Sequence, residues 1–369
     1  MDKIGETTLF IDLKALEHNF SYLKSKIDAK TKFLAVVKAF AYGSDMVTIA
    51  KKLESLGADY LAVAYVKEGV LLRNAGIKTP ILVLHPLPAN FGEMIDYALE
   101  PSLYSPKILK QFLETSKQRQ LIDYPVHIKF NTGLNRLGFW ENDVDHIQEQ
   151  LEGRNELKIT SIFSHLAASE DPSERDFSQN QIHTFEKISK EINEKLNHSP
   201  FRHMLNTSGI LNYPEAQFEM VRSGIGLYGY GNDASVDSEL RPVVTLKTVI
   251  SQMHKIEPNE SVGYNRAYQS EGFRTTATLP LGHADGIGRQ YGNGKTHVII
   301  KGEKAPIIGN VCMDMIMVDV TGIDCQAGDE VLIFGQGTSA EAFANSANTI
   351  SYEILTAISP RVERVIINA

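Results

Sequence analysis

Short apolar runs recur along the first two thirds of the chain, each bounded by polar or turn-forming residues. Runs of this kind predict strands that are buried on both faces, as in parallel sheets. Between the runs, apolar residues recur at helical spacing, most clearly over residues 176–196. The eight predicted strands are FLAVVK from Phe33, YLAVAY from Tyr60, ILVLH from Ile81, SLYS from Ser102, VHIKF from Val126, ITSIFSH from Ile159, RHMLNT from Arg202 and EMVRSG from Glu219.

Eight strand–helix units in about 200 residues favour a (β/α)8 TIM-type barrel over an open sheet. SLYS is the shortest run, so a count of seven strands remains an alternative. After a polar, turn-rich stretch at 231–241, the β-type runs VVTLKTVISQMHKI, TTATLPLG, THVIIKG, APIIG, CMDMIMVDV and EVLIFG follow. They predict a mostly β domain, with helical pattern only at 340–359. We therefore divide the chain into a barrel domain, 1–235, and a smaller β domain, 236–369; residues 4–12 form either an isolated strand or a strand joining the β domain.

Composition and charge narrow the classes of partner. The chain has 369 residues, of which 22% are charged, and a net charge of −8 without a block of Lys or Arg. This balance argues against nucleic acid or an anionic membrane as a partner. The start of the sequence has no basic region followed by an apolar core, and no long apolar span occurs, so we expect a cytoplasmic protein. The two cysteines, Cys312 and Cys325, are expected to be free thiols.

Lys38 is the first candidate for chemistry because it ends a buried run, with Tyr42 and Gly43 on the turn that follows. In α/β folds, functional residues gather at the carboxyl ends of the strands. An amine held against an apolar wall loses its proton more easily, and only the neutral amine adds to a carbonyl. Lys38 is therefore a candidate Schiff-base lysine, and a strand-end lysine that reaches solvent is the alternative.

Other polar residues lie at the predicted ends of several strands. An amine, phosphate ligands and two arginines at one end of a barrel describe a site for pyridoxal phosphate (PLP). His165 belongs to this set, although His127 and His165 could both be hydrogen-bonded core groups. The full set is Lys38, Tyr42, Lys129, Arg136, His165, Asn206, Thr207, Arg222 and Gly224.

Two other site types receive little support. GIGLYG, at 224–229, has the spacing G-x-G-x-x-G, but neither a helix nor an acidic residue about twenty positions on follows it. A backbone nest for one phosphate after the last barrel strand fits this motif better than a dinucleotide site. The eleven histidines include no H-E-x-x-H motif and no Cys/His cluster, so we expect no metal site.

Together, the ordered motifs resemble the alanine racemase family over nearly the whole chain. The related PLP-dependent decarboxylases share the barrel but differ in the motifs of their β domain. The matching segments are AVVKAFAYG around Lys38, KFNTGLNRLGF from Lys129, FSHLAASE with His165, LNTS at Asn206, RSGIGLYG from Arg222, SVGYNRAY with Tyr264, LGHADGIGR, GNVCMDM, and ISYEILTAIS with Tyr352.

The resemblance implies that Lys38 binds PLP as a Schiff base and is one of two catalytic bases. Tyr264 of the partner subunit would be the second base, which implies a homodimer, arranged head-to-tail, with shared active sites. Arg222 would donate to the pyridine nitrogen, and Arg136 would approach the phenolic oxygen and the substrate carboxylate. Met313 would offer a backbone N–H to that carboxylate.

The resemblance also assigns the remaining cofactor-binding residues. His165 would bridge Arg222 and Tyr264, and Asn206 would lie beside the cofactor. Lys129 matches a lysine that family members carry as a carbamate, which would orient Arg136. The phosphate would be gripped by Tyr42, Thr207, Gly224, Ile225 and Tyr352, with Ser208 as an alternative to Thr207.

The implied activity is the interconversion of L- and D-alanine, which supplies D-alanine for peptidoglycan. A racemase needs one group to remove the α-proton and another to return a proton on the opposite face. Tyrosine has a pKa near 10, so Tyr264 needs a neighbour such as His165, backed by Arg222. Because guanidinium keeps its proton, Arg222 would leave the pyridine nitrogen unprotonated, which weakens PLP as an electron sink and limits side reactions.

Some alternatives stay open at this point. The chain could be a broader racemase, for example of serine, or a non-catalytic PLP-binding barrel protein; a nicotinamide oxidoreductase ranks last. Tyr264 could be a turn aromatic, Tyr352 and Met313 could be packing residues, and Lys129 could pair with an acid. The sequence also departs from common family residues at Phe40, Ser44, Asp45, Asn131, His283 and Asn310.

Overall fold

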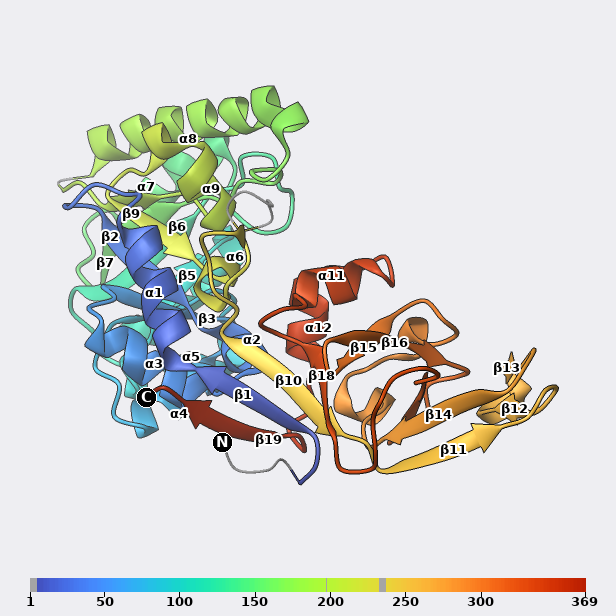
Figure 1. The fold of residues 1–369 in the computed structure, drawn as a ribbon. Coiled ribbons are helices and arrows are strands. Elements are labelled where there is room, and N and C mark those ends of the chain that lie inside the picture. Colours follow the sequence, from blue (N-terminus) through green and yellow to red (C-terminus); the bar gives the residue numbers. More distant parts are fainter. Residues whose placement is uncertain (1–4, 197, 232–236) are drawn as a thin grey trace.

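The computed structural model describes residues 5–196, 198–231 and 237–369, which form a barrel joined to a β domain (Figure 1). Eight parallel strands surround the barrel axis in the order β8-β7-β6-β5-β4-β3-β2-β9. The Arg222 amide donates to the Leu205 carbonyl at 3.1 Å, which brings β9 next to the end of β8. The strands are β2 Lys32–Val36, β3 Tyr60–Val63, β4 Ile81–Val83, β5 Glu100–Leu103, β6 Tyr124–Lys129, β7 Leu157–Phe163, β8 Phe201–His203 and β9 Met220–Ser223.

All eight predicted barrel strands are therefore confirmed, including the short fourth one. Helices cover the outside of the barrel, and α8 spans the predicted amphipathic stretch. Asp12 both ends the first strand of the chain and caps the first helix, since its carboxylate accepts from the amides of Lys14 and Ala15. The barrel helices are α1 Leu13–Lys24, α2 Lys38–Gly43, α3 Met46–Ser55, α4 Val66–Asn74, α5 Phe91–Asp96, α6 Pro106–Gln118, α7 Val144–Leu151, α8 Arg175–Lys195 and α9 Thr207–Asn212.

The β domain is built on a nine-stranded sheet of order β11-β14-β17-β16-β15-β18-β10-β1-β19. Its first strand in the chain, β1 Thr8–Asp12, lies between β10, antiparallel to it, and β19, parallel to it (Figure 1). Two short helices, α11 Ala340–Asn345 and α12 Ser351–Ala357, lie in the predicted helical window. The other strands are β10 Val244–Val249, β11 Gln252–Ile256, β12 Ser261–Val262, β13 Tyr268–Gln269, β14 Arg274–Leu279, β15 His297–Ile300, β16 Glu303–Ile308, β17 Ile316–Asp319, β18 Glu330–Phe334 and β19 Glu363–Ile367.

The structure corrects two details of the predicted β domain. Strand β19 was missed by the pattern analysis, and CMDMIMVDV is only partly a strand, because Cys312 to Met315 form a turn closed by an amide-to-carbonyl bond of 2.9 Å. The predicted domain boundary at 235 and 236 lies outside the described residues, as does part of the linker at 231–241. The boundary therefore stays a prediction.

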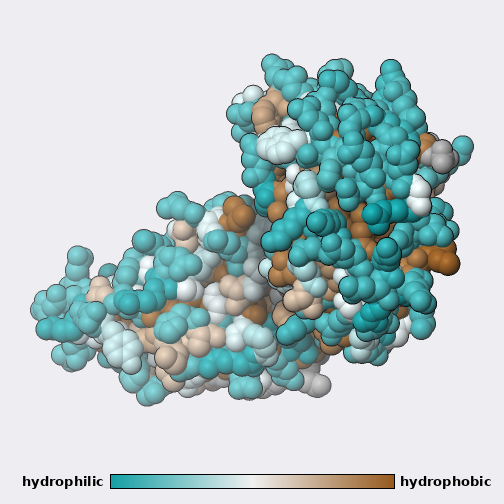
Figure 2. All heavy atoms as spheres, turned by 180° about the vertical axis from the view of Figure 1, so that it is seen from behind, coloured by the Kyte–Doolittle hydropathy of each residue, from teal (hydrophilic) through white to brown (hydrophobic). Residues whose placement is uncertain are grey.

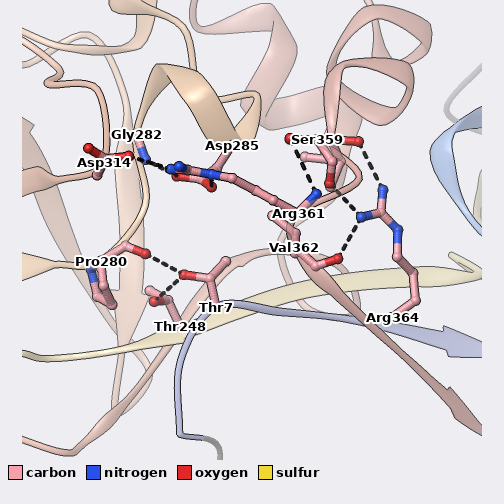
Figure 3. A network of polar contacts seen from close by, with 11 residues as sticks. Thr7, Thr248, Pro280, Gly282, Asp285, Asp314, Ser359, Arg361, Val362 and Arg364 are labelled. Atoms are coloured by element: carbon pink, nitrogen blue, oxygen red, sulfur yellow. Dashed lines mark hydrogen bonds and ion pairs between the residues drawn. The ribbon is translucent and has the colours of Figure 1, made fainter.

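Two arginines near the C-terminal strand tie loops of the β domain together (Figure 3). The Arg361 guanidinium pairs with Asp285, at 2.6 and 3.0 Å, and with Asp314 at 2.6 Å. Arg364 donates to four backbone carbonyls, three in the loop before β19 and one at Gly43 in the barrel, 3.0 Å away. Arg364 thus connects the β domain to the segment that carries Lys38.

The surface and the helices show where apolar residues gather. On the face shown in Figure 2, hydrophilic atoms cover most of the upper part of the barrel, while hydrophobic atoms reach the surface across its lower half, out to the right-hand edge. Among the described residues, no helix is long and apolar enough to cross a membrane. Cys312 and Cys325 are both free, as predicted.

Candidate active site

A cavity of about 700 Å³ lies at the carboxyl ends of the barrel strands. It brings together most of the residues that the sequence nominated from separate strand ends. Apolar walls from Val36, Ala64, Leu84 and Phe163 enclose the polar groups. The predicted residues that line it are Lys38, Tyr42, Lys129, Arg136, His165, Asn206, Thr207, Arg222, Gly224, Ile225 and Tyr352.

The segment after Lys38 is a left-handed turn rather than the start of an ordinary helix. Residues 39–42 all have φ between 53 and 54° and ψ between 44 and 55°. This conformation costs roughly 1–2 kcal/mol per residue for an L-amino acid, so contacts elsewhere must hold it. Glu68 accepts from the amides of Ala39, at 2.6 Å, and Ala64, at 2.7 Å. Gly43 packs so closely that a Cβ there would lie 2.1 Å from the Leu355 carbonyl oxygen.

The environment of Lys38 favours its neutral form. Burial, and after it the charge of Arg136, lowers the pKa of the Lys38 amine below its ordinary value, while Glu68 opposes the shift. A buried amine with a lowered pKa is the nucleophile that carbonyl chemistry requires.

Lys129 and Arg136 approach the cavity from β6 and the loop that follows it. Burial, followed by the charges of Arg136 and Arg222, lowers the pKa of Lys129 to about 7. Asn131 holds the loop, because its side-chain oxygen accepts from the amides of Gly133 and Asn135 at 3.2 and 2.9 Å. An amide oxygen does here what the carboxylate of the more common Asp would do, which explains why Asn is compatible at this position.

Arg222 has a fully satisfied pair of terminal nitrogens. They donate to the imidazole nitrogens of His203, at 2.5 Å, and His165, at 3.0 Å, and to backbone carbonyls including Ser164 at 2.8 Å. Burial and the charge of Arg136 lower the pKa of Arg222 to about 9, so the group is still protonated at neutral pH. Burial and then the charge of Arg222 lower the pKa of His165 well below its ordinary value, so this imidazole is neutral.

Several of the predicted phosphate ligands lie close to one another in the cavity. The Tyr42 hydroxyl lies so close to Gly224 that a Cβ there would come within 2.1 Å of it, so only glycine fits at this position. Tyr42 also stacks on Tyr228 with ring centroids 4.4 Å apart. The Thr207 hydroxyl contacts the Ser223 hydroxyl at 2.9 Å and accepts from the Gly226 amide at 3.2 Å. Thr207 lines the cavity, whereas Ser208 does not.

GIGLYG does not continue as an α-helix. After β9 it forms a short 3₁₀ turn, η5 Ile225–Tyr228, which Gly229 ends with φ 101°. The motif therefore lacks the strand–turn–helix context that a dinucleotide site requires.

Tyr264 and Met313 are the predicted site residues that the cavity does not contain. They line a separate pocket of about 710 Å³ on the β domain, together with Cys312 and Met315. Tyr264 is 70% exposed and Met313 is 59% exposed. Asn310, one of the departures from common family residues, donates to the Tyr264 backbone carbonyl at 3.0 Å. Within one chain, the two groups of predicted residues are not brought together.

The sequence analysis missed two aromatic residues of the cavity, Tyr65 and His85. Their ring centroids lie 5.9 Å apart. Tyr65 is the last residue of the predicted run YLAVAY, and His85 is the last residue of ILVLH. The tendency of functional residues to lie at strand ends, which nominated Lys38, could therefore have nominated them as well.

The composition of the cavity fits an anionic ring cofactor. Two amines and two guanidinium groups line it, and none of its lining residues that the structure describes is acidic. Buried charge of one sign calls for a ligand of the other sign. The described residues contain no group of three or more His, Cys, Asp or Glu side chains able to hold a metal ion. A barrel whose cavity holds a buried amine of lowered pKa and two arginines has the fold and site of a PLP-dependent enzyme.

Comparison with known proteins defines the family more closely. The family "Alanine racemase, N-terminal domain" matches residues 11–232, and "Alanine racemase, C-terminal domain" matches residues 243–366. An alanine racemase of Thermodesulfovibrio yellowstonii is 37% identical over 362 residues, covering 96% of each chain. The chain belongs to the alanine racemase family.

Solved structures agree with this assignment. Alanine racemase of Clostridium difficile is 34% identical, with a TM-score of 0.91 over 99% of this chain and 96% of that one. The alanine racemase of Bartonella henselae with covalently bound pyridoxal phosphate is 28% identical, with a TM-score of 0.91 over 99% of this chain and 100% of that one.

Proposed function

We propose that this chain is a PLP-dependent alanine racemase, an isomerase that interconverts L- and D-alanine and supplies D-alanine for peptidoglycan. The observation that carries the proposal is the cavity where Lys38, Arg136 and Arg222 meet without an acidic lining residue, in a chain that matches the family in both domains.

Each side of the cavity suits one part of the cofactor. Lys38 would hold PLP covalently, and Arg222 would face its ring nitrogen. Arg136 would face the phenolic oxygen and the substrate carboxylate, with Asn206 beside the ring. The phosphate would be bound by Tyr42, Thr207, Gly224, Ile225 and Tyr352, all of which line the cavity.

When bound, the cofactor withdraws electrons from the α-carbon of alanine and so makes its proton more acidic. Lys38 takes or returns this proton on one face, because burial favours its neutral amine. Tyr264 of the partner subunit does the same on the other face. Since Tyr264 is exposed and lies outside the cavity, we propose a head-to-tail homodimer in which Met313 of the partner subunit also offers its amide to the substrate carboxylate.

His165 would prepare the tyrosine for its role. Its Nδ1 accepts from Arg222, so a neutral His165 carries its proton on Nε2 and can donate to the Tyr264 oxygen. A hydrogen bond to the ionised oxygen lowers the pKa of a phenol. Arg222, still protonated at neutral pH, donates to the ring nitrogen without protonating it, which limits side reactions.

Lys129 is proposed to react with carbon dioxide: its neutral amine forms an N–C bond to the carbon, and one N–H proton is released to solvent, which leaves a carbamate. Only a neutral amine forms a carbamate, and the pKa of about 7 makes a large share of Lys129 neutral at neutral pH. The negative carbamate would then face Arg136 and replace the repulsion between the Lys129 and Arg136 cations by attraction.

We also propose a cytoplasmic location and the domain division 1–235 and 236–369, with residues 8–12 added to the β sheet.

The direct test is the optical rotation of pure L-alanine incubated with the PLP-loaded protein, followed by chiral chromatography. Decay to an equal mixture of enantiomers is expected. No decay in a protein that holds PLP would reject alanine as substrate. The same measurement with L-serine, and a search for released carbon dioxide, would then separate a serine racemase from a decarboxylase.

A further inference from the structure

A chain of buried polar side chains runs through the barrel from Arg222 to the fourth barrel strand, away from the cavity. His203, on β8, contacts Arg222 through Nδ1 at 2.5 Å and Ser161 through Nε2 at 2.8 Å. Ser161, on β7, contacts His127 Nδ1 on β6 at 2.6 Å. His127 Nε2 contacts the Glu100 carboxylate on β5 at 2.7 Å. His127, Ser161 and His203 are fully buried.

When both histidines are neutral, the two ends of this chain fix the direction of every hydrogen bond in it. Guanidinium only donates, so His203 Nδ1 must accept. Burial and then Arg222 lower the pKa of His203 well below its ordinary value. A neutral His203 therefore carries its proton on Nε2 and donates it to Ser161.

The same reasoning continues from the other end. An ionised Glu100 only accepts, so His127 carries its proton on Nε2. The single hydroxyl proton of Ser161 is then directed to the free Nδ1 of His127. Each donor meets one acceptor, and no proton is left unplaced. His203 also stacks flat on Phe163, with ring centroids 4.7 Å apart and planes 5° from parallel, which limits rotation of the imidazole.

We propose that this relay, anchored at Glu100, positions Arg222 to donate to the ring nitrogen of PLP. The relay keeps the lone pair of His203 Nδ1 directed at the Arg222 guanidinium. It also places the Glu100 carboxylate at the end of the relay opposite to Arg222. The inference rests on the proposed function, because it concerns the residue assigned to the ring nitrogen. Glu100, His127, Ser161 and His203 act through Arg222 and are positioning residues.

Removing the hydroxyl of Ser161, in the middle of the relay, should leave Arg222 less firmly held in its position. In Ser161→Ala, the Nε2 proton of His203 loses its acceptor, and the alternative proton position, on Nδ1, would face the guanidinium. Unsatisfied buried donors are costly, so the imidazole and Arg222 must rearrange. Ser102 on β5 offers a matched control: it is equally buried, and its hydroxyl has no hydrogen-bond partner among the described residues.

The first experiment determines where His203 carries its proton. We would measure 15N chemical shifts of histidine-labelled protein without cofactor, in the wild type, Ser161→Ala and Ser102→Ala. The wild type and Ser102→Ala should show His203 protonated on Nε2 alone, and in Ser161→Ala the Nε2 resonance should shift because its proton has lost the Ser161 acceptor. Protonated Nδ1 in the wild type, or no change in Ser161→Ala, would overturn the relay. This measurement needs no PLP, so it stands even if the proposed function fails.

The second experiment connects the relay to the cofactor. PLP affinity and kcat should each fall about tenfold in Ser161→Ala, the loss expected for one disrupted buried hydrogen bond. The KM for alanine should change less, because the substrate carboxylate is bound at Arg136. Ser161→Thr, which keeps the hydroxyl, should recover most of the loss, and Ser102→Ala should show none. Equal effects of Ser161→Ala and Ser102→Ala would overturn the link to Arg222.

Glu100→Gln tests the anchor itself, since it keeps an acceptor but removes the charge. We expect a loss of PLP affinity of about threefold, smaller than in Ser161→Ala because the amide oxygen can still accept from His127. Unchanged affinity together with an unchanged His203 proton position would overturn the role of Glu100 and leave the relay ending at Ser161.

Discussion

The two proposed bases lie in opposite environments, one in the barrel cavity and the other on the β domain. We call the second region the Tyr264 surface; it is the β-domain pocket lined by Tyr264, Cys312, Met313 and Met315. Lys38 lies in a cavity where burial, and after it the charge of Arg136, already lowers its pKa. Tyr264 is 70% exposed, on a separate pocket. One half of the proposed chemistry thus lies in a cavity within a single chain, and the proposal assigns the other half to a second copy.

The largest effect is expected from replacing Lys38, the proposed base in the barrel cavity. Lys38→Ala removes both the covalent attachment and one base, so racemisation should fall by about 10³-fold or more. Mass spectrometry after borohydride reduction should find no cofactor attached to the variant. The control is Lys32→Ala, which changes the lysine at the start of β2, the strand that precedes Lys38. A cofactor still fixed to the Lys38→Ala protein would move the attachment elsewhere.

Replacing Tyr264, the proposed base on the Tyr264 surface, should leave the cofactor bound. Tyr264→Phe should bind PLP with unchanged affinity, measured by absorbance, and lose about 10²–10⁴-fold in turnover in at least one direction. Tyr268→Phe, a nearby tyrosine on β13, should keep its activity. Unchanged rates of Tyr264→Phe in both directions would remove this residue as a base.

Mixing the two inactive variants sharpens the comparison. In a mixed dimer of Lys38→Ala and Tyr264→Phe chains, one site combines an intact Lys38 with an intact Tyr264 if the site is shared. Activity should therefore return after unfolding and refolding the two variants together, but not when each is refolded alone. If both bases of a site came from the same chain, the mixture would stay inactive.

The electrostatics of the cavity predict a smaller effect on stability. The pKa of Lys129 is about 7 in the folded chain and about 10.4 when unfolded. Between these values the unfolded chain binds more protons, so this group makes the free energy of unfolding rise with pH by up to about 1.4 kcal/mol per unit. Below pH 7, the cost of burying the charged amine is fully present.

Lys129→Met should therefore gain most stability over the wild type near pH 6, and the gain should shrink toward pH 9. Urea unfolding in buffers free of carbon dioxide measures both free energies. Lys110→Met, at an exposed position, should show a difference that does not change with pH. A constant gain for Lys129→Met would contradict a shifted pKa.

The contact between the barrel and the β domain can be tested at Gly43. Gly43→Ala should lower the free energy of unfolding by about 2–3 kcal/mol, because the Cβ would both strain φ and meet the Leu355 carbonyl. Gly57→Ala provides the control, since φ is also positive there but nothing lies within 4 Å of the new Cβ. Equal losses in the two variants would mean that packing against α12 adds nothing.

Much of the site could be predicted from the sequence because strand ends of a barrel converge. Lys38, Arg136, His165 and Arg222 lie far apart in the chain, yet each follows or ends a strand whose apolar pattern was clear. The left-handed turn at 39–42 could not be predicted, since no residue there except Gly43 favours positive φ and the contacts that hold it come from Glu68, Leu355 and Arg364. Strand β19 was missed because it is an edge strand with no fully buried residue, so its sequence lacks the long apolar run of the barrel strands.

The contact of Arg364 with Gly43 also bears on the order of events during synthesis. The two residues are 321 positions apart, so at about 5–20 residues per second the ribosome needs roughly 16–64 s to add Arg364 after Gly43. The barrel strands are complete long before this, but the turn that carries Lys38 lacks one of its braces until then. During this period the newborn chain has its barrel strands but lacks both Tyr352, which lines the cavity, and Arg364, which contacts the turn after Lys38.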